Sequence, residues 1–216
     1  MKKQFVNLLC LLLGIALGLG GCLLFLFIRD GSLEGRDAPA AETVAVESVD
    51  IRNEELARLA MGVADCLARE DYAALAEYVH PEYGLVFSPY ATIHLGTNQC
   101  FTPQRVAVAD RDKTVYVWGI KYGSDEPIQL TAKQFLSEIL YDRDYARAPV
   151  MGFDTVLRSG NALENVTVAF PEAHFVDLCF PSSSADAADW RILRLVFEDW
   201  QGSMRLSALI HSEYTE

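Results

Sequence analysis

The fold is decided near the carboxyl end by two segments of alternating apolar residues, RILRLVFED (residues 191–199) and MRLSALIH (residues 204–211). Alternation with a period of two is typical of strands that bury one face. The predicted buried faces carry Leu193, Leu195 and Phe197 on the first strand and Leu206, Ala208 and Ile210 on the second. Gln201-Gly202-Ser203 connects them, and a short connection that contains glycine predicts an antiparallel hairpin.

Two adjacent helices are predicted upstream. Asn53 can cap a helix whose apolar residues recur at the 3.6-residue period over residues 56–67. Asp71 can cap a second, shorter helix, which His80-Pro81 ends. The tight connection between the two predicts a helical hairpin.

The middle of the chain completes the predicted domain. Thr131 and Gln134 form a capping box that predicts one further helix. Other strands are expected at 84–89, 114–120, 153–158, 165–170 and 174–180. We therefore expect an α+β fold in which the helical hairpin and the further helix pack on a curved, mostly antiparallel sheet. This order of elements is similar to the cone-shaped NTF2-like fold, which implies a pocket between sheet and helices.

The front of the chain is predicted to be a membrane segment. Lys2 and Lys3 precede an uncharged run from Phe5 to Ile28. As a helix, these 24 residues would extend about 36 Å, enough to cross a hydrocarbon core of about 30 Å. The basic residues before the run favour an amino end inside the cell and a domain on the extracytoplasmic side. The first expected partner is therefore the lipid bilayer, through residues 5–28.

A lipoprotein signal is the alternative for this segment. Leu19-Gly20-Gly21-Cys22 resembles a lipobox, the pattern at which a bacterial signal is cleaved before a cysteine that is then acylated. The chain stays apolar from Leu23 to Ile28, which favours a retained signal anchor, a single transmembrane helix. The predicted organisation is a membrane anchor or lipoprotein signal over 1–29, a flexible linker over 30–50 and an extracytoplasmic α+β domain over 51–216.

The charge excludes one class of partner. The 216 residues carry 18 basic and 30 acidic side chains, a net charge of −12. Nucleic acid binding needs a basic face, so it is not expected. Without residues 1–31 the balance is 15 basic against 29 acidic, or −14. An anionic membrane surface would repel such a domain, so only the anchor would hold it there.

Several stretches of the predicted domain resemble a family of bacterial cell-surface proteins. They are HPEYGLVFSPY (80–90), WGI (118–120), PIQLT (127–131), LRLVFE (193–198) and LIH (209–211). Members of that family are lipoprotein-like and carry a domain of unknown function. The resemblance therefore implies a location at the cell surface and the extent of the domain, and it brings no catalytic residue with it.

No motif for catalysis, a cofactor or a metal is apparent. The sequence holds no G-x-S-x-G, P-loop, G-x-G-x-x-G, C-x-x-C or H-E-x-x-H pattern. The acidic pair Asp142 and Asp144 is expected to lie in a solvated loop, and His211 at an exposed or rim position. Three domain cysteines allow one disulfide and a free thiol, but three reduced thiols are favoured. They are Cys66, Cys100 and Cys179.

An aromatic set is the most suggestive feature for function. Tyrosine and tryptophan offer flat apolar faces with a polar group, which suits small-ligand sites. The candidate binding residues are Tyr83, Tyr90, His94, Trp118 and Tyr122. Strands are also rich in aromatic residues for packing reasons alone.

These observations favour a membrane-anchored extracytoplasmic binding or interaction module without a catalytic motif. Its partner would be an envelope protein or a small ligand. The alternative is a small enzyme that uses His94 or His211 as a base beside a carboxylate in a cone-shaped pocket. A third reading is a structural subunit that docks on another membrane protein.

Overall fold

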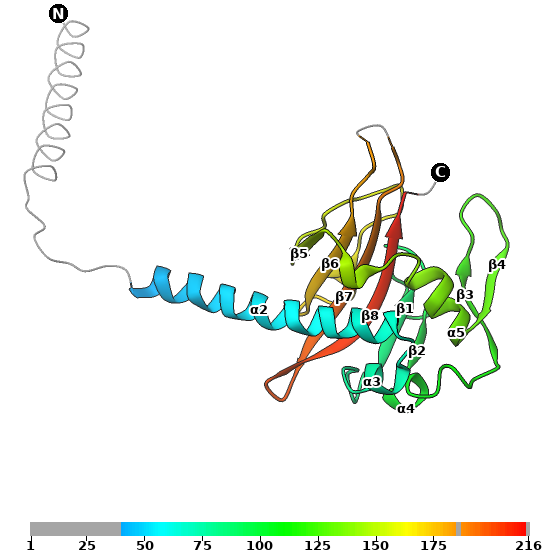
Figure 1. The fold of residues 1–216 in the computed structure, drawn as a ribbon, viewed down its shortest axis with the longest axis horizontal. Helices are drawn as coiled ribbons and strands as arrows, with labels where there is room; N and C mark the ends of the chain where they lie inside the picture. The colour runs from blue at the N-terminus through cyan, green and yellow to red at the C-terminus, as the bar shows by residue number, and fades with distance from the viewer. Residues whose placement is uncertain (1–39, 185–186, 215–216) are drawn as a thin grey trace, which may run out of the picture. The chain divides into compact units, whose positions relative to one another are not determined.

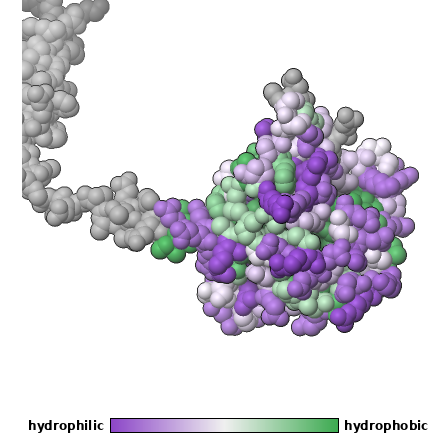
Figure 2. All heavy atoms as spheres, in the orientation of Figure 1, coloured by the Kyte–Doolittle hydropathy of each residue, from purple (hydrophilic) through white to green (hydrophobic). Residues whose placement is uncertain are grey.

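The structure is a computed structural model that describes residues 40–184 and 187–214. The predicted membrane segment, the lipobox at Cys22 and the first part of the linker lie outside these residues. Within the part of the chain that is described, no helix has both the length and the apolar character needed to cross a membrane. From Ser48 onward the chain forms one compact unit. Hydrophilic residues cover most of the face of this unit that Figure 2 shows.

One mostly antiparallel sheet organises the compact unit (Figure 1). It has six strands in the order β2-β1-β8-β7-β6-β5, and only the β1–β8 pair is parallel. Its strands are β1 (Leu85–Ser88), β2 (Gln99–Phe101), β5 (Val150–Phe153), β6 (His174–Phe180), β7 (Arg191–Trp200) and β8 (Ser203–Glu213). A separate antiparallel pair consists of β3 (Val115–Ile120) and β4 (Pro127–Thr131).

The carboxyl-terminal hairpin forms as predicted, with a bulge that the alternation did not predict. Gln201 and Gly202 both have positive φ, 55° and 81°, as a tight turn between twisted strands requires. The register pairs Val196 with Ala208 but Phe197 with Leu206, so Ser207 is an extra residue in β8.

This bulge changes which side chains share a face of β8. Leu206 lies in the main core with Leu209, whereas Ala208 and Ile210 lie in a second apolar cluster. The predicted common face for Leu206, Ala208 and Ile210 is therefore wrong. On β7 the predicted face of Leu193, Leu195 and Phe197 is confirmed, because all three lie in the main core.

Two of the three predicted helix caps are confirmed, and the cap predicted at Asn53 is wrong, because Asn53 lies inside a helix. Asp71 accepts a hydrogen bond from the Ala74 amide at 3.0 Å, and Thr131 and Gln134 form the capping box. A π-helical turn, η1, continues directly from the helix that Thr131 caps. The helical elements are α2 (Ala40–Ala68), α3 (Tyr72–Ala76), α4 (Pro103–Val106), α5 (Ala132–Gln134), η1 (Phe135–Leu140), η2 (Tyr145–Arg147) and α6 (Val166–Ala169).

The first helix is longer than predicted. It begins at Ala40 rather than after Asn53, so residues 40–50 of the predicted linker are helical. The division into anchor, linker and domain stays a prediction, because residues 1–39 are not described.

Two predicted strands differ from the structure. Residues 166–169 form a helical turn, in which Val166 and Phe170 are buried while Val168 is 80% exposed. Burial at i and i+4 suits a helix, whereas a strand would have placed all three on one face. The strand predicted from Phe153 instead ends there, at β5. Asp154 follows with a φ of 48°, and its carboxylate accepts a hydrogen bond from the Phe175 amide at 2.8 Å.

Both faces of the sheet are covered. The part of α2 from Leu56 onward packs on one face, where the main core forms (Figure 1). The opposite face carries Ile93, Phe175 and Val196 beneath the segment 154–170. The fold is therefore α+β with a mostly antiparallel sheet. The three domain cysteines are all free, with Cys66 and Cys179 buried and Cys100 exposed.

Candidate functional site

Four of the five predicted binding residues surround one cavity. Its volume is about 600 Å³. Its wall is formed by two segments, residues 88–98 after β1 and residues 117–123 at the end of β3. Tyr90, His94, Trp118 and Tyr122 all contribute to this wall. Sequence reasoning missed the smaller residues between them, because Pro89, Thr92 and Gly119 carry no chemical signal of their own.

Trp118 belongs to the inner wall of this cavity. Its side chain is only 2% exposed and stacks on Phe135, with ring centroids 3.9 Å apart and planes 4° apart. The indole N–H donates to the Leu130 carbonyl at 2.9 Å. One face and the polar group of this tryptophan are therefore used within the protein, and little of its surface is left for a ligand.

Tyr90 and Tyr122 are the aromatic residues that a ligand can reach. Their rings meet edge to face, with centroids 4.4 Å apart at 80°, and the Tyr122 amide donates to the Tyr90 hydroxyl at 3.3 Å. Burial raises the pKa of Tyr90, so the phenol stays neutral. This contact joins the 88–98 segment to the β3–β4 hairpin. Tyr122 is 42% exposed.

Tyr83 and His94 differ from the other candidates. Tyr83 does not line the cavity. Its ring stacks on His80, 4.3 Å between centroids, and it is 66% exposed. His94 lies at the rim with its side chain exposed. Its backbone amide donates to the side-chain oxygen of Asn98 at 2.6 Å, which shapes the turn there.

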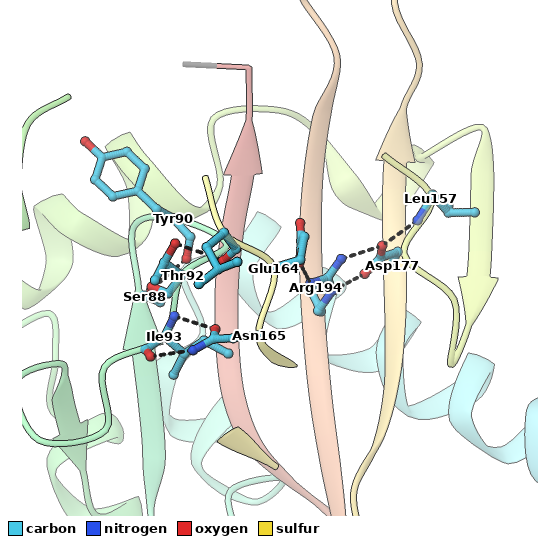
Figure 3. A network of polar contacts seen from close by, with 10 residues as sticks. Ser88, Tyr90, Thr92, Ile93, Leu157, Glu164, Asn165, Asp177 and Arg194 are labelled. Carbon is cyan, nitrogen blue, oxygen red and sulfur yellow. Dashed lines mark hydrogen bonds and ion pairs between the residues drawn. The ribbon is translucent and has the colours of Figure 1, made fainter. Parts of the chain in front are cut away.

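Residues 88–98, here called the cavity segment, are held by a network of polar contacts (Figure 3). Part of this network comes from residues that cover the face of the sheet opposite the main core. Ser88 donates to the carbonyl oxygens of Tyr90 and Thr92, at 2.7 and 3.2 Å. The Asn165 side chain binds the main chain of Ile93 twice: its oxygen accepts from the amide at 2.8 Å, and its nitrogen donates to the carbonyl at 2.9 Å. The loop that carries Tyr90 and His94 is therefore fixed at both ends.

Glu164, the residue before Asn165, is bound to a buried arginine, and this fixes the position of Asn165. Glu164 accepts from the fully buried Arg194 at 2.5 Å. Arg194 also donates twice to Asp177, at 2.6 and 3.0 Å, and Figure 3 shows it between the two carboxylates. Burial lowers the pKa of Arg194, but the hydrogen bonds and charges of Asp177 and Glu164 outweigh that effect and leave its pKa raised.

Lys121 is the cation of the cavity wall. Its ammonium lies 2.8 Å from the Glu126 carboxylate. The hydrogen bond and charge of Glu126 raise the pKa of Lys121. The cavity is thus mainly apolar and aromatic, and its one lysine is already paired.

A second, smaller hollow of about 160 Å³ adjoins the first, since Pro89 and Tyr90 line both. His211, Asp142, Glu138 and Glu213 supply its polar groups. One prediction is wrong here. His211 is 4% exposed rather than at a rim, because the bulge in β8 sends it to the face that bears the main core. Asp142 lies in a loop, as predicted, but its side chain is only 22% exposed.

Asp142 is the centre of this hollow's polar contacts. It accepts from the Tyr145 hydroxyl at 2.8 Å and from Arg191 Nε at 3.0 Å. Its Oδ1 lies 3.3 Å from His211 Nε2. Burial raises the pKa of Asp142, but His211, Tyr145 and Arg191 together outweigh burial and leave its pKa below the usual value. The carboxylate is therefore charged at neutral pH.

Metal ligands are not gathered in either hollow. Across residues 40–184 and 187–214, no group of three or more His, Cys, Asp and Glu side chains could hold an ion. Glu172, His174 and Asp177 are close in sequence, but His174 contacts Asp154 at 2.7 Å and Asp177 contacts Arg194.

Comparisons with known proteins give little to set beside this geometry. No family model matches the chain, and no curated protein matches it. One solved structure is similar over 83% of this chain and 91% of its own, at 11% identity and a TM-score of 0.31. It is described as a calcium/calmodulin-dependent protein kinase II association domain from Xanthomonas campestris.

Proposed function

We propose that this protein is a binding module that takes a small, largely apolar ligand with a flat ring into the aromatic cavity. The observation that carries the proposal is the convergence of Tyr90, Trp118 and Tyr122 on one cavity of about 600 Å³. Ligand sites are commonly apolar cavities of about 300–1,000 Å³ with a few polar groups. A ring lying against Tyr90 and Tyr122 would gain edge or offset contacts with both.

The proposal includes a location. The uncharged run from Phe5 to Ile28 would anchor the protein in a membrane, as a retained helix or as a lipoprotein acylated at Cys22, with the domain on the extracytoplasmic side. The basic start of the chain and the resemblance to bacterial cell-surface proteins support this part. An NTF2-like cone is the corresponding proposal for the fold, and it rests on the order of the helices and strands.

A neutral fluorophore, N-phenyl-1-naphthylamine, tests the binding function. The chain from Ser48 onward should increase its fluorescence. Tyr122→Ala should weaken binding about fivefold to tenfold, because an aromatic contact contributes about 1 kcal/mol. Tyr83→Ala removes an exposed tyrosine outside the cavity and is the matched control. Equal loss in both variants, or no binding by the parent chain, would contradict the proposal.

A small enzyme remains the second candidate, favoured by the contact of His211 with Asp142. A carboxylate that orients a histidine is a common arrangement for a general base. The support is weaker, because both ring nitrogens of His211 are inaccessible to solvent and a base must reach the proton it removes. Hydrolysis of p-nitrophenyl acetate above the buffer rate, lost in His211→Gln, would favour this function. A rate equal to that of buffer would count against it.

A further inference from the structure

We infer that the two hollows form one bipartite site, and that the smaller one selects a ligand whose ring carries a protonated amine. This inference deepens the proposed function and rests on it. The ring would lie in the aromatic cavity, and the amine would pass Tyr90 into the hollow lined by Glu138, Asp142, His211 and Glu213.

Continuity is the first step. Pro89 and Tyr90 line both hollows, so the two spaces adjoin at these two residues. Tyr90 is partly exposed, and its hydroxyl is held at 3.3 Å by the Tyr122 amide. We expect a ligand with two or three carbon atoms between its ring and its amine to reach past this side chain.

Charge is the second step. Three carboxylates line the smaller hollow, and its described lining includes no lysine or arginine. Arg191 contacts two of them from outside the hollow, Asp142 at 3.0 Å and Glu213 at 2.9 Å. Glu138 forms no ion pair among the described residues. The net charge around the smaller hollow is therefore negative, so it would attract the ammonium group of a ligand and repel a carboxylate group.

An incomplete set of hydrogen bonds is the third step, and it is independent of the charge. His211 is nine-tenths buried, and neither ring nitrogen has a well-directed hydrogen bond. Its Nε2 lies 3.3 Å from Asp142, and its Nδ1 has no partner in the described part of the chain. Buried polar groups without partners are rare in folded proteins. The three carboxylates of the hollow can only accept hydrogen bonds, so they too call for a donor. An ammonium in the hollow would donate hydrogen bonds to these carboxylates and balance their charge.

Three probes with the same ring test the inference: tryptamine, neutral 3-methylindole and anionic indole-3-propionate. The full-length chain is placed in phosphatidylcholine nanodiscs, and empty nanodiscs give the blank for equilibrium dialysis. Tryptamine should bind about fivefold more tightly than 3-methylindole, and indole-3-propionate should bind most weakly. Glu138→Gln should weaken tryptamine about threefold without changing 3-methylindole. Glu172→Gln removes the same charge from an exposed position outside both hollows and should change neither.

The outcomes distinguish a failure of the bipartite site from a failure of the proposed binding function. Equal affinities for the three probes, or equal effects of Glu138→Gln and Glu172→Gln on tryptamine, would overturn the bipartite site while leaving the aromatic cavity in place. Absence of binding by all three would overturn the proposed function itself.

Discussion

Replacing Arg194 by methionine tests the network that holds the cavity segment. Methionine keeps much of the length of the arginine and removes its charge and its donors. The change leaves Asp177 fully buried, where the Leu157 amide still donates to it at 3.1 Å. It also frees Glu164, the residue before Asn165.

The magnitude follows from this burial. Arg194 and Asp177 are both 0% exposed, and removing one partner of such a pair costs about 3–5 kcal/mol, because the other charge stays buried without compensation. For a domain of this size each kcal/mol lowers the melting temperature by about 2–4 °C. We therefore expect a loss of roughly 10 °C.

Urea unfolding and thermal melting of the chain from Ser48 onward measure this cost. Arg69→Met is the matched control, because the Arg69–Asp65 pair spans 3.7 Å with side chains 64% and 55% exposed, and exposed pairs contribute about 0–1 kcal/mol. A loss below 1 kcal/mol in Arg194→Met, equal to that of Arg69→Met, would refute the reasoning. The double variant Arg194→Met with Asp177→Leu should be less destabilised than the sum of the single changes.

Three further predictions concern other parts of the molecule. Asn165→Ala removes both bonds to the Ile93 main chain and should cost about 1–3 kcal/mol in urea unfolding; an unchanged midpoint would show that the cavity segment is held elsewhere. The hydrogen bond from Tyr116 lowers the pKa of Asp112 to about 2, so a carboxyl titration by NMR should show that midpoint and Tyr116→Phe should raise it. Because this pKa is depressed in the folded state, the stabilisation from Asp112 is present above its ordinary pKa of 3.8 and is lost as the pH falls towards 2. The full-length protein should need detergent, whereas the chain from Ser48 should stay folded without it, and aggregation of the shorter form would contradict the predicted linker.

Local signals predicted most of the fold. Caps at Asp71 and Thr131 depend on neighbours three residues away, and they appear in the structure as expected. The terminal hairpin was predictable for the same reason, because its turn and its alternation are contiguous in sequence. These features depend little on the rest of the protein.

Tertiary contacts decided the parts that were missed. The β-branched residues Val166, Thr167 and Val168 indicate a strand, but the bonds of Asn165 to Ile93, 72 residues away, fix this segment as a helical turn. The bulge at Ser207 is likewise invisible in the alternation, yet it determines which face His211 occupies. Both features depend on packing against residues that are distant in the sequence, so the local sequence pattern does not predict them.

The candidate site was predictable by residue type and not by geometry. Aromatic residues between the helical hairpin and the middle helix suggested a binding site, and four of the five candidates line one cavity. Tyr83 shares the same sequence features, but it stacks on His80 instead. Polar neighbours surround Asp142 in sequence and indicate a solvated loop, whereas Tyr145 and Arg191 bind its carboxylate in the fold.

An NMR titration of the chain from Ser48 with 3-methylindole tests the central claim most directly, because it locates the bound molecule. The account predicts that amide shifts change mainly within residues 88–98 and 117–123, and at the indole N–H of Trp118. The indole N–H of Trp200, which lies near His80 on the Tyr83 side, should not move. Shifts concentrated at Trp200, with Trp118 unchanged, would place the ligand outside the aromatic cavity and contradict the account.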